Sequence, residues 1–74
     1  MNDDRFYTGM STITRTLDSI EIKQGTREAK ATARATIAEY IRADEKSAHG
    51  YGVFCGAVEW LAAAEGLKEK QEVY

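Results

Sequence analysis

The chain has 74 residues, and its ten Lys and Arg against twelve Asp and Glu give a formal net charge of −2. So small an acidic excess argues against a general nucleic-acid binder, and so short a chain supports only one domain with a small core. Cys55 and His49 are the only cysteine and the only histidine, which excludes an internal disulfide and disfavours a structural zinc site. We therefore expect one domain over residues 1–74 without metal or cofactor, and small domains of this kind often gain stability by oligomerisation.

No segment approaches the roughly 20 apolar residues of a membrane span. The first five residues, Met1–Arg5, also lack the basic start of a signal peptide. A lone thiol fits a reducing compartment. We expect a cytoplasmic protein without a membrane partner.

The first element is open to two interpretations. Helical spacing of three and four residues joins the apolar side chains Phe6, Met10, Ile13, Leu17 and Ile20. The β-branched runs 12–16 and 20–23 could instead pair as a hairpin around residues 18–19. The first interpretation gives an all-α bundle or helical hairpin with an N-terminal helix, and the second an α+β fold with a hairpin over residues 11–23 before two helices. Residues 1–10 could also be a flexible extension, with Met10 as the native start.

The middle element is predicted as a helix over about residues 27–46, because Ala, Glu, Lys and Arg dominate this segment. Gly25 and Thr26 before it are typical of a helix end followed by a new N-cap. At 100° per residue one face carries the apolar positions Ala29, Ala33, Ile37, Tyr40 and Ile41. The other break lies around residues 47–52, and we predict a turn at Gly50–Gly52 within it.

The last helix, over residues 52–66, is apolar around most of its circumference. One face combines Val53, Ala57, Trp60, Leu61, Ala64 and Leu67. Gly66 followed by Leu67 resembles a Schellman stop, which would leave residues 68–74 as a frayed tail. A helix that is apolar on several sides is normally buried on several sides. Small residues elsewhere on its surface would let another helix approach closely, so we predict a homodimer through Gly52, Gly56, Trp60, Ala62, Ala63 and Gly66. These small residues could equally serve packing within one chain.

Four basic residues, Lys23, Arg27, Lys30 and Arg34, are spaced four, three and four apart. On a helix that ran through Gly25 all four would form one stripe, and on a helix starting at Arg27 three of them still would. The stripe is a candidate anion-binding site for a nucleic acid or nucleotide. No aromatic residue interleaves the stripe to stack on bases, which favours a solvated face.

We expect no enzymatic activity, because Cys55 and His49 are six residues apart and fall on different helical faces. The pattern best fits a small accessory protein that binds other proteins: a regulator or inhibitor of a larger macromolecular partner, acting as a homodimer. Binding of nucleic acid or nucleotide through the basic stripe is the alternative.

Overall fold

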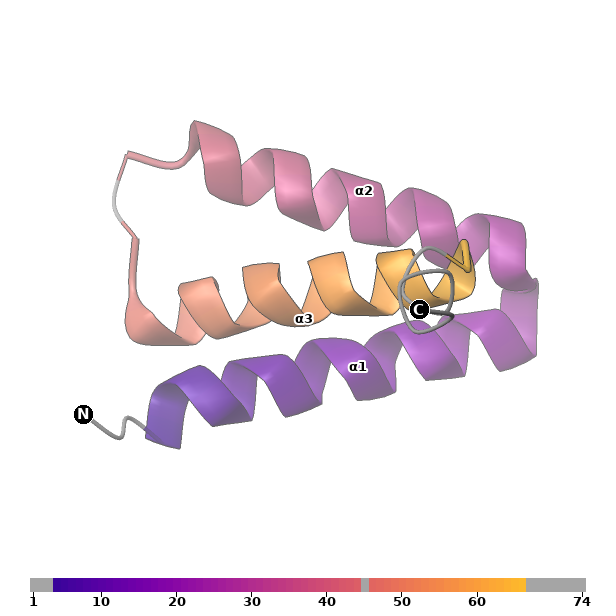
Figure 1. Cartoon of the computed structure of the whole chain (residues 1–74), viewed down its shortest axis with the longest axis horizontal. Coiled ribbons are helices and arrows are strands. Elements are labelled where there is room, and N and C mark those ends of the chain that lie inside the picture. Colours follow the sequence, from indigo (N-terminus) through magenta and orange to yellow (C-terminus); the bar gives the residue numbers. More distant parts are fainter. Residues whose placement is uncertain (1–3, 45, 67–74) are drawn as a thin grey trace, which may run out of the picture.

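The computed structural model describes residues 4–44 and 46–66, which form three α-helices (Figure 1). The helices are α1 over Asp4–Gln24, α2 over Thr26–Arg42 and α3 over Ala48–Ala64. α2 runs antiparallel to the other two, and α3 contacts both of them. No strand occurs in these described ranges, so the all-α class is confirmed and the hairpin alternative for residues 11–23 is wrong.

Helix α1 starts at Asp4, within the segment that we predicted could be a flexible N-terminal extension. Residues 4–10 form its first turns rather than a flexible segment, and Gly9 is buried there. The physical reason is that Phe6 and Met10 prolong the apolar face of Ile13 and Leu17, so packing stabilises the additional turns. Residues 68–74, expected as a frayed tail, lie outside the described residues.

One residue, Gly25, connects α1 to α2. Its φ of 103° lies in a region that side-chain-bearing residues avoid, which makes glycine the suitable residue for so tight a turn. Its amide donates to the Glu21 carbonyl at 3.0 Å. The Thr26 hydroxyl also donates to Glu21, at its Oε2 over 2.8 Å. The chain therefore reverses direction within a single residue.

The second connection, between Arg42 and Ala48, lies earlier in the chain than predicted, because α2 ends at Arg42 rather than near residue 46. Ala43 takes an extended conformation with ψ 137°, and the Lys46 ammonium group donates to its carbonyl. α3 then begins at Ala48, where the N-cap residue Ser47 accepts a hydrogen bond from the amide of Gly50 at 2.9 Å. The prediction of a turn at Gly50–Gly52 is therefore wrong, since this side-chain cap starts the helix before it.

The C-terminal end of α3 follows the predicted stop as far as it is described. Gly66 has φ 79°, and its amide donates to the Ala63 carbonyl at 3.1 Å, as expected for a glycine just beyond a helix end. Leu67, the other half of the predicted motif, lies outside the described residues.

The core is small and lies where the three helices meet. Among the described residues, Leu17 is the only large side chain with no exposed surface, and the other buried apolar residues are Ile13, Ala29, Ala33 and Ala57. Half-buried side chains surround them: Ile37, Val53, Trp60 and Leu61. The predicted apolar face of α2 is wrong at Ile41, because the side chain of this residue is 65% exposed. It sits at the edge of that face, about 120° from Ala29, near the end of α2 that diverges from α3 (Figure 1).

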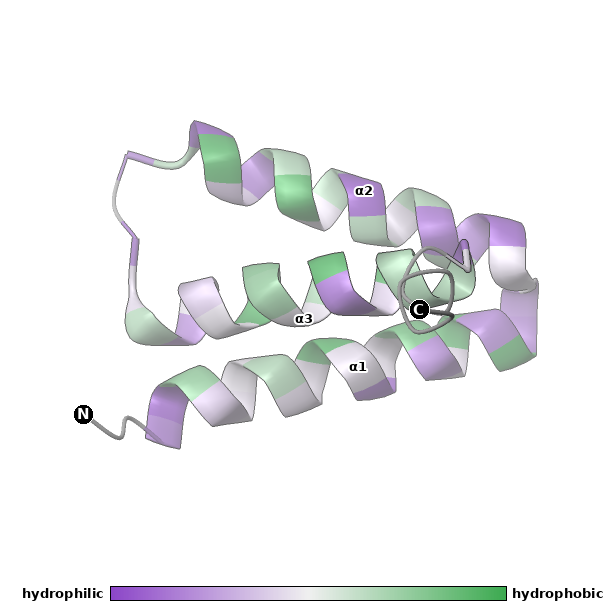
Figure 2. Ribbon diagram, viewed as in Figure 1, coloured by the Kyte–Doolittle hydropathy of each residue, from purple (hydrophilic) through white to green (hydrophobic). Residues whose placement is uncertain are grey.

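Hydropathy differs among the helices. In Figure 2, α3 is pale to green along most of its length, whereas purple segments recur along α1 and α2. α3 is thus the apolar centre of the bundle, with polar character concentrated on the other helices.

Candidate interaction surface

Two glycines of α3, Gly52 and Gly56, face α1 of the same chain. A Cβ added to Gly52 would collide with the backbone carbonyl of Phe6. A Cβ added to Gly56 would lie 2.5 Å from Cγ2 of Ile13 and 3.1 Å from the carbonyl oxygen of Met10. Both glycines are buried. The two helices therefore approach so closely that no side chain fits between their backbones.

Gly9 is the matching residue on α1. A Cβ at this position would collide with the His49 carbonyl and lie 2.9 Å from the amide nitrogen of Val53. We call Gly9, Gly52 and Gly56 the glycine seam. Sequence reasoning missed Gly9, although its place four residues before Ile13 puts it on the apolar face of α1.

The seam corrects the predicted self-association site at two positions. Gly52 and Gly56 do admit a second helix backbone, but that backbone is α1, so the alternative of packing within one chain holds for them. Geometry on a helical wheel identifies close approach without identifying the approaching helix.

Trp60 also acts within the chain. Its indole nitrogen donates to Oδ1 of Asp18 on α1 at 2.9 Å, and its ring packs against the core. Of the other predicted interface residues, Ala62 and Gly66 are half-buried and Ala63 is exposed. Contact of these three with a second chain stays a prediction.

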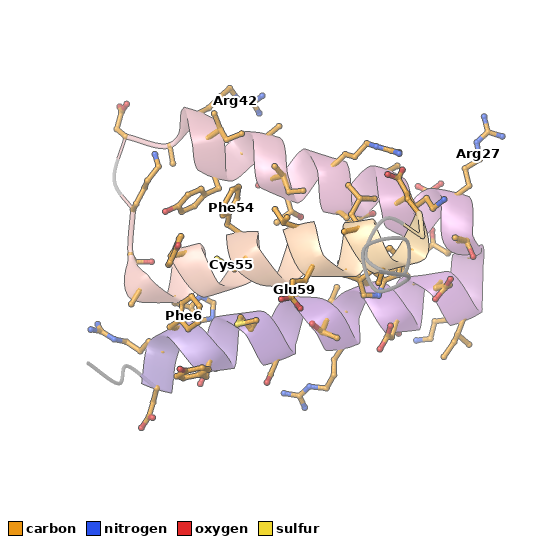
Figure 3. The ribbon with its side chains drawn as sticks, viewed as in Figure 1. Phe6, Arg27, Arg42, Phe54, Cys55 and Glu59 are labelled. Carbon is orange, nitrogen blue, oxygen red and sulfur yellow. The ribbon has the colours of Figure 1, made fainter. Side chains whose placement is uncertain are left out.

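A different apolar strip of α3 points outward. Its members are spaced four, three and four residues apart and lie within about 60° of one another around the helix; they are Tyr51, Cys55, Val58 and Ala62, which we call the outward stripe. Tyr51 is 48% exposed and Val58 40% exposed, while Cys55 and Ala62 are half-buried. None of the four carries a formal charge at neutral pH. Figure 3 labels Cys55 on the stripe and Glu59 on the adjacent side, toward α1.

The stripe ends in an aromatic cluster where α2 and α3 diverge. Ring centroids lie 5.1 Å apart for Phe6 and Tyr7, 5.4 Å for Phe6 and Tyr51, and 4.5 Å for Tyr40 and Phe54. Phe54 fills the space between α2 and α3, and Phe6 lies between α1 and α3 (Figure 3). Stacked and edge-on rings at such distances stabilise one another beyond simple burial. The cluster thus joins all three helices at the end where α2 diverges from α3.

Tyr51 belongs to both the cluster and the stripe. A side-chain hydrogen bond with Cys55, one helical turn away, raises the pKa of the Tyr51 hydroxyl above its usual value of 10.0. The charge interaction with the Cys55 sulfur, desolvation and the neighbouring Tyr40 act in the same direction. Tyr51 is therefore neutral at physiological pH, and the stripe keeps its uncharged character.

The basic residues do not form one helical stripe. Gly25 ends the first helix, so Lys23 lies in the last turn of α1 and the other three lie on α2. Arg34 pairs with the Glu65 carboxylate at the end of α3. Arg27 projects away from the bundle in Figure 3. A four-residue stripe would need a helix continuous through Gly25, which the structure does not have. Arg27, Lys30 and Arg34 keep the spacing of a three-residue stripe on α2, in which Arg34 is paired with Glu65.

The described residues show neither a metal-binding cluster nor a membrane-spanning helix. Within residues 4–44 and 46–66, no group of three or more His, Cys, Asp or Glu side chains could hold a metal ion. None of the helices in the same ranges is long and apolar enough to cross a membrane.

Comparisons of the chain with protein-family models, curated proteins and solved structures find no match.

Proposed function

We propose that the protein is a non-enzymatic interaction module that forms a homodimer through α3 and regulates or inhibits a larger macromolecular partner. The observation that carries this proposal is the outward stripe. Two sides of α3 are used inside the chain, one against α1 and one against the core, yet a third side also carries apolar residues. Water-exposed helix faces normally carry charged and polar residues instead.

The energetic argument comes from the small core. Within residues 4–44 and 46–66, Leu17 is the only large side chain that is fully buried, so this part of the chain has little apolar burial to offset the entropy of folding. A second copy seated on the stripe would remove Tyr51 and Val58 from water, which stabilises by about 25 cal/mol per Å² of apolar surface. A single helix face covers less than the roughly 800 Å² per partner of a standard interface, so we expect a dissociation constant in the micromolar range.

The aromatic cluster is the surface we assign to the larger partner. Tyr7 is 57% exposed, and its ring contacts Phe6 from outside the core. Tyrosines held in place by neighbouring rings are frequent anchors of protein interfaces, because little side-chain entropy is lost on binding. Because Tyr51 belongs to the cluster and to the stripe, binding of the partner and binding of a second copy would influence each other.

The test is the effect of a charge on the stripe. In Val58→Glu, a carboxylate would have to be desolvated at the dimer interface, whereas Thr12→Glu places the same group on the exposed surface of α1. Sedimentation velocity over roughly 1 to 500 µM should show wild type and Thr12→Glu moving from monomer to dimer mass, while Val58→Glu remains monomeric. The melting temperature of wild type should rise with concentration, and that of Val58→Glu should not. A wild-type chain that is monomeric throughout, with a constant melting temperature, would overturn the proposal.

A further inference from the structure

We infer that the two copies pair through α3 in antiparallel orientation, about a twofold axis that passes between Gly56 and Ala57. This inference rests on the proposed homodimer and adds its geometry. In this arrangement Tyr51 of one copy lies against Ala62 of the other, and Cys55 lies against Val58. Each pair occurs twice, as a twofold interface requires.

Side-chain size favours this orientation. The outward stripe has its largest residue, Tyr51, at the N-terminal end and its smallest, Ala62, at the C-terminal end. Parallel pairing would bring two Tyr51 rings together and leave a gap between two Ala62 methyl groups. Antiparallel pairing places large against small at both ends, so the helix axes keep a constant separation and the contact stays close-packed.

Disulfide trapping distinguishes the orientations. In a Cys55→Ser background, one chain carries Tyr51→Cys and a second, isotope-labelled chain carries Ala62→Cys. In antiparallel pairing positions 51 and 62 face each other, whereas two copies of position 51 are eleven residues apart along the helix, about 16 Å. A disulfide spans Cα separations of only about 4.4 to 6.8 Å. Oxidation of the mixture with copper–phenanthroline, read by mass spectrometry, should give the mixed disulfide in at least about tenfold excess over either homodisulfide.

Tyr51→Cys removes a ring from the aromatic cluster and could therefore unfold the chain. A second pair of cysteine variants leaves Tyr51 in place. The wild-type chain, with its native Cys55, is mixed with a chain carrying Cys55→Ser and Val58→Cys. Antiparallel pairing makes the mixed 55–58 disulfide the main product. Circular dichroism of each variant before oxidation shows which pair retains the helical fold, and the disulfide products are measured in that pair.

The outcomes separate the two proposals. Predominance of homodisulfides in whichever pair retains the helical fold would show parallel pairing and overturn the inference while leaving the homodimer intact. Dimers by sedimentation that give no disulfide at these positions would place the interface elsewhere and overturn it as well. A wild-type chain that is monomeric at all concentrations overturns the proposed function itself. If the chain dimerises only after deletion of residues 67–74, its own C-terminal segment occupies the stripe, and the inference is wrong for the full chain.

Discussion

The indole nitrogen of Trp60 lies 2.9 Å from Oδ1 of Asp18 and donates a hydrogen bond to it, which joins the C-terminal half of α3 to α1. The glycine seam joins the N-terminal halves of the same two helices. The pair α1 and α3 is therefore fastened at both ends, by backbone contact at one and by a charge-assisted hydrogen bond at the other. These two attachments fix the position of α3 on α1, and with it the position of the outward stripe.

Loss of the Asp18 carboxylate should destabilise the domain modestly. Asp18 is exposed, so Asp18→Ala should lower the free energy of unfolding by about 1 kcal/mol, below the usual range for a hydrogen bond to a charged group. Urea unfolding at neutral pH measures this value. Trp60→Phe removes the donor but retains an apolar ring, and the double variant should cost less than the sum of the two single variants. Additive effects would show that the hydrogen bond contributes nothing to stability.

Alanine at Gly52 should be far more damaging than at Gly50, although both lie in α3. The methyl group at Gly52 collides with the Phe6 carbonyl, while at Gly50 it meets only the Ser47 hydroxyl oxygen at 3.1 Å. We expect Gly52→Ala to lower the free energy of unfolding by about 3 kcal/mol and Gly50→Ala to change it by less than about 1 kcal/mol. Thermal melts followed by circular dichroism compare the two. Similar melting temperatures would mean that α1 and α3 are not in backbone contact.

The pKa of Tyr51 should depend on Cys55. Because the hydrogen bond with Cys55 is the largest cause of the raised pKa, Cys55→Ala should lower the pKa of Tyr51 toward 10.0. A raised pKa in the folded state means that Tyr51 contributes its stability fully below pH 10 and loses it as the pH rises through the folded-state pKa. Titration of tyrosine absorbance near 295 nm, with Tyr51→Phe subtracted, isolates the group. An unchanged titration in Cys55→Ala would contradict the assigned cause.

Nucleic-acid binding should be weak and sensitive to salt. The basic residues are divided between two helices, and Arg34 is paired with Glu65, so few phosphates could be contacted at once. We expect dissociation constants above roughly 10 µM for DNA and RNA at physiological salt, measured by fluorescence anisotropy. Sub-micromolar binding that is lost in the Arg27→Ala and Arg34→Ala double variant would instead support the anion-binding alternative.

The spacing of apolar residues predicted the second and third helices and most of the buried faces, while the first segment stayed open between a helix and a hairpin. Ile13, Leu17, Ala29, Ala33 and Ala57 are buried as their spacing predicted, because a helix repeats every 3.6 residues whatever surrounds it. Gly25 and Gly66 were recognised as helix ends for a similarly local reason, since both have positive φ. At other boundaries local signals were not enough: α2 ends four residues early, and α3 begins at the Ser47 cap before the glycines that suggested a turn.

The neighbour that each face of α3 meets depends on how the three helices are placed relative to one another. The small size of Gly52 and Gly56 was visible in the sequence, but the residues that they contact lie more than forty positions earlier in the chain: Phe6 for Gly52, and Met10 and Ile13 for Gly56. The same holds for Trp60, whose hydrogen bond to Asp18 spans 42 residues, and for the outward stripe, which is defined by what α1 and α2 leave uncovered. Helical periodicity gives the angle of a side chain around its own axis, whereas contact between helices depends on how three axes are placed in space.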